Sequence, residues 1–163
     1  MGSSYQQVEQ SALDLVALSP DDLDDILELE RQGYATPWSE QIFRDCFRAD
    51  YRLWGVRVAG VLAGYSIGAR MVDEIHLLNL CVGHRHRKSG LGRRLLRHLA
   101  TEAAREGVNR LLLEVRRSNY QAIELYRSEG LTVIGERPGY YPDGAGREDA
   151  LVMALDLSAT TDA

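Results

Sequence analysis

Two kinds of hydrophobic pattern alternate along the chain. Apolar residues that alternate with polar ones, or that form short continuous runs, predict strands, whereas apolar residues that recur every three or four positions predict amphipathic helices. The predicted strands are Ala12–Leu18, Arg52–Val58, Val61–Arg70, Ile75–Val82, Asn109–Val115, Leu131–Glu136 and Asp149–Leu157. The predicted helices are Ser19–Gln32 and Ser39–Phe47, each counted from its N-cap, Leu91–Glu106 and Tyr120–Glu129.

Local signals mark the ends of several of these elements. The run Ser19–Asp22 supplies an N-cap, a proline at the first helical position and acids in the first turn. Asn119 is expected to cap the last helix, and Gly107 and Gly130 stand where C-terminal caps belong. Ala59-Gly60 is expected to turn an antiparallel hairpin.

Two further stretches carry specific expectations. Ile75–Val82 is almost continuously apolar, which predicts a strand buried on both faces. It follows a turn over Met71–Glu74. Pro138–Gly144 combines aromatic residues with turn-forming ones, which predicts an aromatic loop.

The order of the elements predicts the fold class. The chain reads β-α-α-β-β-β-α-β-α-β-β, with hairpins before and after one β-α-β crossover and no internal repeat. This order predicts an α/β or α+β fold with a mixed sheet. Residues 12–157 are expected to form a single domain, preceded by a disordered lead at 1–11 and followed by a tail at 158–163.

The composition is that of an ordinary globular domain. The chain has 163 residues, of which 45% are hydrophobic and 26% charged, enough for one full core. Cys46 and Cys81 show no Cys-x-x-Cys spacing and have no histidine at ligand spacing, so both are expected in the core and no metal is predicted. No apolar leader and no run of ~18 apolar residues is present, so we expect a cytoplasmic protein without a membrane partner.

The net charge of −5 conceals a division of sign. Acidic residues crowd the first predicted helix, whereas His84–Arg97 is strongly basic. An acidic chain with one basic cluster predicts a discrete anionic ligand, and it argues against nucleic acid as a partner. The alternative is a basic helix face that is merely solvated.

The basic stretch Arg87–Gly92 is the strongest single candidate for an anion site. It stands between a predicted strand and a predicted helix, and its glycines let the backbone approach a diphosphate while the helix N-terminus offers N–H donors. It is neither a P-loop nor a dinucleotide fingerprint. The alternative is a helix start whose glycines serve tight packing.

Other motifs in a fixed order give the anion a candidate identity. Arg87–Gly92 follows a predicted strand, Asn119 and Tyr126 belong to the last predicted helix, and Gly130-Leu131 closes it. In this order and spacing the chain resembles the GNAT superfamily of acetyl-CoA-dependent N-acetyltransferases over Ser19–Leu157. The resemblance implies the GNAT fold, a mostly antiparallel twisted sheet of about seven strands flanked by about four helices.

Within that superfamily, five further motifs look like the RimI-type ribosomal-protein-alanine N-acetyltransferases. They are Thr36–Ser39, Leu113–Asn119, Ala122–Tyr126, Tyr140–Pro142 and Gly146–Ala150. Members of this family acetylate the N-terminal alanine of one small-subunit ribosomal protein. Gly83–His86 departs from the family, which usually has Asp-Pro and an aromatic residue there, and this puts the form of the loop in doubt.

The resemblance also implies roles for individual residues. Glu114 would be the general base and Tyr126 the general acid. Acetyl-CoA would be the cosubstrate, with no metal. Its implied contacts are Leu80, Cys81, Val82, Arg87, Lys88, Ser89, Gly90, Leu91, Gly92, Arg93 and Asn119.

The chemistry of these side chains is consistent with such roles. An α-amine has a pKa of about 8, so it must lose a proton before it attacks a thioester. A glutamate at a strand end can accept that proton, a tyrosine can protonate the leaving thiolate, and a backbone N–H near Val82 could hold the thioester oxygen. The alternatives are that Glu114 only pairs with an arginine such as Arg116 and that Tyr126 is a core-edge aromatic.

The acceptor site is assigned to three aromatic residues, and the histidines are left out of it. Trp38, Tyr140 and Tyr141 are expected to wall the acceptor site, the alternative being plain loop packing. Four histidines are expected to be solvated or structural, since no carboxylate partner or metal spacing singles one out. They are His76, His84, His86 and His98.

Together these features predict an enzyme that transfers acetyl from acetyl-CoA to the α-amine of a protein by direct attack. The expected partner is a protein N-terminus, that of a ribosomal protein with an N-terminal alanine. The alternatives are a small-molecule amine or a lysine side chain as acceptor, and a binding module that holds acetyl-CoA without turnover.

Overall fold

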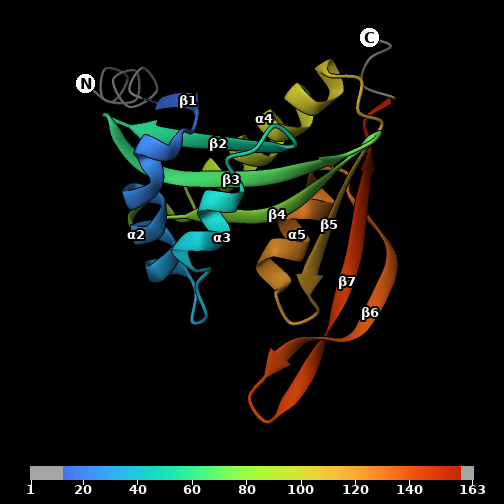
Figure 1. Cartoon of the computed structure of the whole chain (residues 1–163). Helices are drawn as coiled ribbons and strands as arrows, with labels where there is room; N and C mark the ends of the chain where they lie inside the picture. The colour runs from blue at the N-terminus through green and yellow to red at the C-terminus, as the bar shows by residue number, and fades with distance from the viewer. Residues whose placement is uncertain (1–12, 159–163) are drawn as a thin grey trace, which may run out of the picture. The chain divides into compact units, whose positions relative to one another are not determined.

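The computed structural model of the chain describes residues 13–158. The predicted lead at 1–11 and all of the predicted tail except Ser158 lie outside the described residues. Within them the strands are β1 Leu13–Ala17, β2 Tyr51–Val58, β3 Val61–Met71, β4 Glu74–Val82, β5 Arg110–Arg116, β6 Thr132–Asp143 and β7 Gly146–Asp156 (Figure 1). The helices are α2 Leu23–Gly33, α3 Glu40–Asp45, α4 Leu91–Arg105 and α5 Tyr120–Ser128, with 3-10 turns at Pro20–Asp22 and His84–His86.

The strands form one mixed sheet, as the order of elements predicts. Its strand order is β1-β2-β3-β4-β5-β7-β6. The pairs β1–β2, β5–β7 and β6–β7 are antiparallel, and β4 pairs with β5 in parallel through Glu74–Leu77 and Arg110–Leu113. The predicted α/β fold with a mostly antiparallel sheet is therefore confirmed.

The described residues form two compact units. The N-terminal unit holds residues 13–68 and 79–99, and the C-terminal unit holds residues 69–78 and 100–158. The single domain predicted over residues 12–157 stays a prediction.

The core of the N-terminal unit lies on both faces of its strands. On one face, α2 and α3 pack against β2 and β3 through fully buried residues such as Ile26, Phe43 and Tyr65. On the other face, α4 packs against β2 and β3. Cys46 and Cys81 are both free and buried in the first cluster, so their predicted role as core residues is confirmed.

The predicted helix boundaries are largely confirmed. Ser19 and Asp22 form a capping box around Pro20, although the first turn is a 3-10 turn rather than α-helix. Ser39 accepts a hydrogen bond from the Ile42 N–H at 3.3 Å and so caps α3. Asn119 caps α5 in the same way.

The expectation that the strand at Ile75–Val82 is buried on both faces is wrong. Along β4, buried residues alternate with less buried ones, and Leu78 is 39% exposed. The second face is covered only in part, because Leu80 and Val82 pack against the α4 cluster while Leu78 faces solvent. The apolar run in the sequence therefore did not reveal how much of each face of this strand is covered.

The expectation of an aromatic loop at Pro138–Gly144 is also wrong. These residues continue β6 as far as Asp143, in the long hairpin with β7 that Figure 1 shows in orange and red. A register shift between Arg137 and Tyr141 accommodates the extra residues. At this shift, two side chains of β7 take the place of backbone hydrogen bonds between the strands. Asp149 accepts a hydrogen bond from the Gly139 N–H at 2.8 Å, and Arg147 donates one to the Gly139 carbonyl oxygen.

Candidate active site

Glu114 occupies the less buried face of β5 in the C-terminal unit. Leu113 and Val115 point into the core, so the intervening side chain points to the opposite face. The Glu114 side chain is 12% exposed, and its Oε1 lies 3.0 Å from Nε of Arg137. The arginine partner considered from the sequence, Arg116, instead donates to the Pro142 carbonyl at 3.1 Å and to Glu148 at 3.4 Å.

His76 faces the same carboxylate. Its Nε2 lies 3.7 Å from Glu114 Oε1. The parallel ladder pairs His76 with Leu112, two residues before Glu114, so the two side chains share a face of the sheet. The expectation that no histidine has a carboxylate partner is therefore wrong for His76, because strand pairing brings together residues that are far apart in sequence.

Two tyrosines of β6 complete the surroundings of Glu114. The rings of Tyr140 and Tyr141 meet edge to face, with centroids 4.9 Å apart. A hydrogen bond to Glu114 raises the pKa of Tyr140. Burial, followed by the charge of Glu114, raises the pKa of Tyr141 to about 12. The guanidinium carbon of Arg116 stands 4.5 Å from the Tyr141 ring centroid, which holds that ring from one side.

Tyr126 on α5 is linked to these residues through Tyr141. Its side chain is buried. Burial, and then the interaction with Tyr141, raises the pKa of Tyr126 to about 12. The phenol is therefore protonated at neutral pH and can act as a proton donor. The structure thus brings Glu114, Tyr126, Tyr140 and Tyr141 into one electrostatic cluster, which we call the carboxylate–tyrosine cluster.

Asn119 is a helix cap by its geometry. Its Oδ1 accepts a hydrogen bond from the Ala122 N–H at 3.3 Å, which satisfies one of the first donors of α5. The side chain is exposed. Its implied contact with the cosubstrate stays a prediction.

The implied cosubstrate residues, apart from Asn119, belong to the N-terminal unit. Leu80 and Val82 at the end of β4 are half-buried against the α4 cluster, whereas Cys81 is buried. Burial raises the pKa of the Cys81 thiol to about 11. At neutral pH this cysteine is a protonated thiol, which is a poor nucleophile.

The loop before α4 combines left-handed backbone with exposed positive charge. Lys88 and Gly90 both adopt left-handed φ angles, of +63° and +84°. The first N–H groups of α4, which have no acceptor within the helix, follow directly. A Cβ added at Gly90 would meet nothing within 4 Å, and Arg87 and Lys88 are exposed. The loop is therefore open to solvent, positively charged and suited to an anionic group.

A buried network at Glu30 is the main feature of the N-terminal unit that the sequence did not reveal. Glu30 is 1% exposed. Its carboxylate accepts from the Tyr65 hydroxyl at 2.9 Å, from Asn79 Nδ2 at 3.1 Å and from the Trp38 backbone N–H at 3.2 Å. A signal was present, because Glu30 follows Leu23, Ile26 and Leu27 at the spacing of the apolar stripe of α2.

Tyr34 connects the loop between α2 and α3 to the same strand. Its hydroxyl donates to the Leu80 carbonyl oxygen at 2.8 Å and lies 3.2 Å from Asn79 Oδ1. Trp38, further along this loop, packs on Phe43 with ring centroids 5.3 Å apart. The alternative of loop packing therefore describes part of what Trp38 does, and its role as a wall of the acceptor site stays a prediction.

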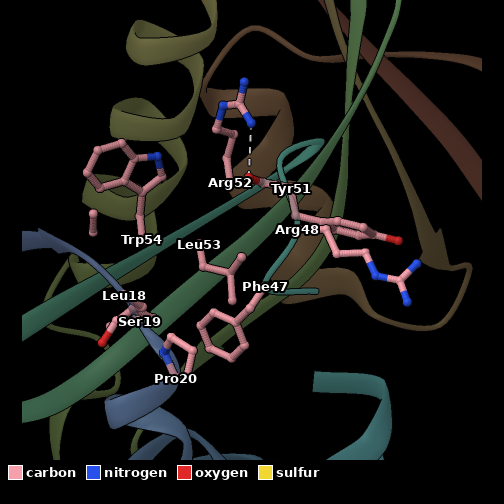
Figure 2. Close-up of a pocket in the computed structure, with 10 residues that line it drawn as sticks. Leu18, Ser19, Pro20, Phe47, Arg48, Tyr51, Arg52, Leu53 and Trp54 are labelled. Atoms are coloured by element: carbon pink, nitrogen blue, oxygen red, sulfur yellow. Dashed lines mark hydrogen bonds between the residues drawn. The ribbon is translucent and has the colours of Figure 1, made fainter. Parts of the chain in front are cut away.

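The N-terminal unit also has a cavity of about 360 Å³. It is lined by Ala17, Leu18, Ser19, Pro20, Phe47, Arg48, Tyr51, Arg52, Leu53 and Trp54. Figure 2 shows the Arg52 guanidinium turned back onto the Tyr51 carbonyl, to which it donates at 3.0 Å. None of the predicted site residues lines the cavity.

Two further findings concern residues 13–158 as a whole. No group of three or more His, Cys, Asp or Glu side chains in this range is arranged to hold a metal ion. None of the helices between these limits has the length and apolar character to cross a membrane.

Comparison with known proteins gives matches over most of the chain. Residues 21–131 match the acetyltransferase (GNAT) family. The ribosomal protein bS18-alanine N-acetyltransferase of Escherichia coli (strain K12) is 39% identical over 142 residues, which are 87% of this chain and 96% of that protein. The enzyme of the same name from Haemophilus ducreyi is 33% identical over 138 residues, which are 83% of this chain and 94% of its own.

Solved structures agree with the sequence matches. The crystal structure of the ribosomal-protein-S18-alanine N-acetyltransferase from Escherichia coli has a TM-score of 0.86 and 38% identity, covering 90% of this chain and 94% of that one. At the level of fold alone, Ard1 from Thermoplasma volcanium has a TM-score of 0.79 at 23% identity and covers 89% of this chain and 97% of its own.

Proposed function

The chain belongs to the GNAT acetyltransferases and, within them, to the RimI-type ribosomal-protein-alanine N-acetyltransferases, and from this membership we propose that its acceptor is the N-terminal alanine of a small-subunit ribosomal protein. It is an acetyl-CoA-dependent N-acetyltransferase. The observation that carries the choice of acceptor is the 39% identity, over almost the full length of both proteins, to an Escherichia coli enzyme named for that reaction. A cytoplasmic location is part of the same proposal.

The carboxylate–tyrosine cluster supports direct transfer. Glu114 accepts the proton that the α-amine loses as its nitrogen attacks the acetyl carbonyl carbon. Tyr126 donates its phenolic proton to the sulfur when the carbon–sulfur bond breaks. Acetyl-CoA supplies the activated acyl group, and no bond to the protein forms, which accords with the protonated state of the buried Cys81 thiol.

The loop at Arg87–Gly92 is assigned to the diphosphate of acetyl-CoA. In this assignment the loop, with its left-handed residues Lys88 and Gly90, offers backbone N–H groups together with the start of α4, and the side chains of Arg87, Lys88 and Arg93 add positive charge. Leu80–Val82 and Asn119 are assigned to the rest of the cosubstrate. The Val82 N–H is assigned to the thioester oxygen.

The acceptor is assigned to Trp38, Tyr140 and Tyr141. Tyr140 and Tyr141 adjoin Glu114, so an amine between them would meet its base. A non-catalytic binding module would need the loop before α4 but neither Glu114 nor Tyr126. For the enzyme itself, a small-molecule amine and a lysine side chain are the alternative acceptors, and an experiment must separate them from a protein N-terminus.

An acceptor panel tests the proposal. The purified protein is incubated with acetyl-CoA and one of three acceptors: an alanine-terminated ribosomal peptide, the same peptide with a blocked N-terminus and an internal lysine, or spermidine. CoA release and intact mass are measured. We expect acetylation of the free alanine alone. Faster transfer to lysine or spermidine than to the free alanine would overturn the choice of acceptor. Binding of acetyl-CoA without any acetylated product would overturn the proposed catalytic activity.

Gly90→Ala is expected to raise the KM for acetyl-CoA several-fold. An alanine at a φ of +84° costs about 1–2 kcal/mol, so the loop leaves its anion-binding shape. Gly107→Ala is a matched control, because Gly107 has a φ of +83° and, like Gly90, no atom within 4 Å of an added Cβ. It should lose similar stability by thermal unfolding while keeping the KM. Equal changes in KM for both variants would contradict the assignment.

The pH dependence follows from the raised pKa of Tyr126. Since burial keeps the phenol protonated up to about pH 12, the acid form persists throughout the accessible range. We expect kcat/KM for the alanine peptide to rise as the amine, with its pKa of about 8, loses its proton, and not to fall by about pH 10.5. A descending limb near pH 9 that disappears in Tyr126→Phe would contradict the assignment.

The same shift predicts the pH dependence of stability. A tyrosine in the unfolded chain ionises near its ordinary pKa of 10.0, whereas Tyr126 in the folded chain ionises at about 12. Between these values the unfolded state binds fewer protons, so the free energy of unfolding falls as pH rises through this window. Denaturant titrations of wild type and Tyr126→Phe in this window measure the contribution.

A further inference from the structure

The carboxylate of Glu114, the proposed general base, already has two partners in the structure. One oxygen, Oε1, is 3.0 Å from the Arg137 guanidinium, and the Tyr140 hydroxyl is hydrogen-bonded to the same carboxylate. Both partners already occupy the carboxylate that would receive the amine proton. The Glu114 side chain is also only 12% exposed, so a proton that reaches it has little direct contact with water and needs a neighbouring place to go.

His76 offers that place. Its Nε2 is 3.7 Å from the same Oε1, and the imidazole is 26% exposed whereas the carboxylate is 12% exposed. The imidazole is therefore the more exposed of the two groups. An imidazole has an ordinary pKa of about 6.5, between the values for a carboxyl group and an α-amine, and it exchanges protons readily near neutral pH.

The sheet holds the two groups in this relation. His76 and Glu114 stand on the paired parallel strands β4 and β5, on one face and two residues out of register. A separation of 3.7 Å is looser than a hydrogen bond, but catalytic contacts in ligand-free structures are often long and tighten when substrate binds. The charged and titratable groups around the pair are Arg137, Tyr140 and Tyr141 from β6, all of which interact with Glu114.

We propose that His76 is the proton relay behind Glu114. The amine proton passes to Glu114 Oε1 as the new carbon–nitrogen bond forms, then from Oε1 to the neutral Nε2 of His76, and from the resulting imidazolium to solvent. Glu114 is thereby returned as a carboxylate for the next turnover. Arg137 lies at the same oxygen, so the imidazolium would form close to a second positive charge. The inference rests on the proposed function, since it needs Glu114 to receive the amine proton.

The first test compares His76→Gln with wild type at two pH values. The alanine-terminated peptide is the acceptor, at saturating acetyl-CoA. At about pH 6.5, where the amine arrives protonated, we expect kcat to fall about tenfold. At about pH 9.5, where most of the amine is free, kcat should lie within about twofold of wild type. The KM for acetyl-CoA should not change at either pH.

His98→Gln is the matched control. His98 lies on α4, where its ring packs edge-on against Trp54 at a centroid distance of 4.3 Å. Its variant should keep the wild-type pH profile. A loss in His76→Gln that is equal at both pH values would mean a structural role and would overturn the relay, as would no loss at either.

Chemical rescue provides a second variant. His76→Ala leaves a space beside Glu114 that opens towards solvent, so added imidazole should restore kcat at about pH 6.5 in proportion to its free base. Imidazole that restores nothing would overturn the relay. Failure of the proposed function gives a different result: wild type itself would then release no CoA with the alanine peptide.

Discussion

Replacing Glu114 by Gln is expected to lower kcat for the alanine-terminated peptide by about 10²–10⁴-fold while leaving the KM for acetyl-CoA unchanged. The amide keeps the shape of the side chain but cannot accept the amine proton. Its loss leaves Arg137 without its carboxylate, but the Arg137 side chain is 55% exposed and water can solvate it, so the fold should survive. Steady-state kinetics with both substrates measure the effect.

Glu136→Gln is the matched control for this variant. Glu136 also pairs with an arginine, Arg117, but both side chains are about half exposed and lie outside the carboxylate–tyrosine cluster. Its kcat should stay within about twofold of wild type, since exposed ion pairs contribute little. If Glu114→Gln kept kcat within about threefold of wild type, Glu114 would be a structural partner of Arg137 and not the base.

Replacing Glu30 by Ala is expected to reduce the free energy of unfolding by about 3–5 kcal/mol, because the buried donors of Tyr65, Asn79 and Trp38 lose their acceptor. For a chain of this size such a loss lowers the melting temperature by about 10 °C. Thermal and denaturant unfolding measure it. The control is Glu28→Ala, in the same helix but exposed, which should change stability by no more than about 0.5 kcal/mol. If the two variants had equal melting temperatures, the hydrogen-bond network of Glu30 would not contribute to stability as predicted.

Most of the fold could be predicted from local signals in the sequence. The N-cap at Ser19, the cap at Asn119 and the turn at Ala59-Gly60 depend on neighbours within a few residues, so the sequence displays them directly. The continuation of β6 through Pro138 could not be predicted in this way. It depends on side chains of Asp149 and Arg147 that replace backbone partners from the opposite strand.

The residues of the candidate site stay a prediction from the sequence, whereas the contacts among them could be read only from the structure. Glu114 and Tyr126 follow from family motifs, and the structure joins them through Tyr141. The partners of Glu114 come from β4 and β6, which lie beside β5 or across β7 from it, and linear spacing does not reveal such neighbours. The position of Glu30 on the apolar stripe of its helix was a signal of burial in the sequence. A carboxylate is nevertheless expected at the surface unless the groups that donate hydrogen bonds to it are known, and those come from distant parts of the chain.

If the proposed sites are right, the hydrogen bond from the Tyr34 hydroxyl to the Leu80 carbonyl oxygen connects the segment that binds the acceptor to the one that binds acetyl-CoA. It ties the loop that carries Trp38 to the strand end assigned to acetyl-CoA. If each ligand shifts its own segment, the occupancy of one alters the affinity for the other, and thermodynamic reciprocity makes the factor the same in both directions. The two substrates would then bind cooperatively, and the hydrogen bond of the Tyr34 hydroxyl would contribute to the size of that effect.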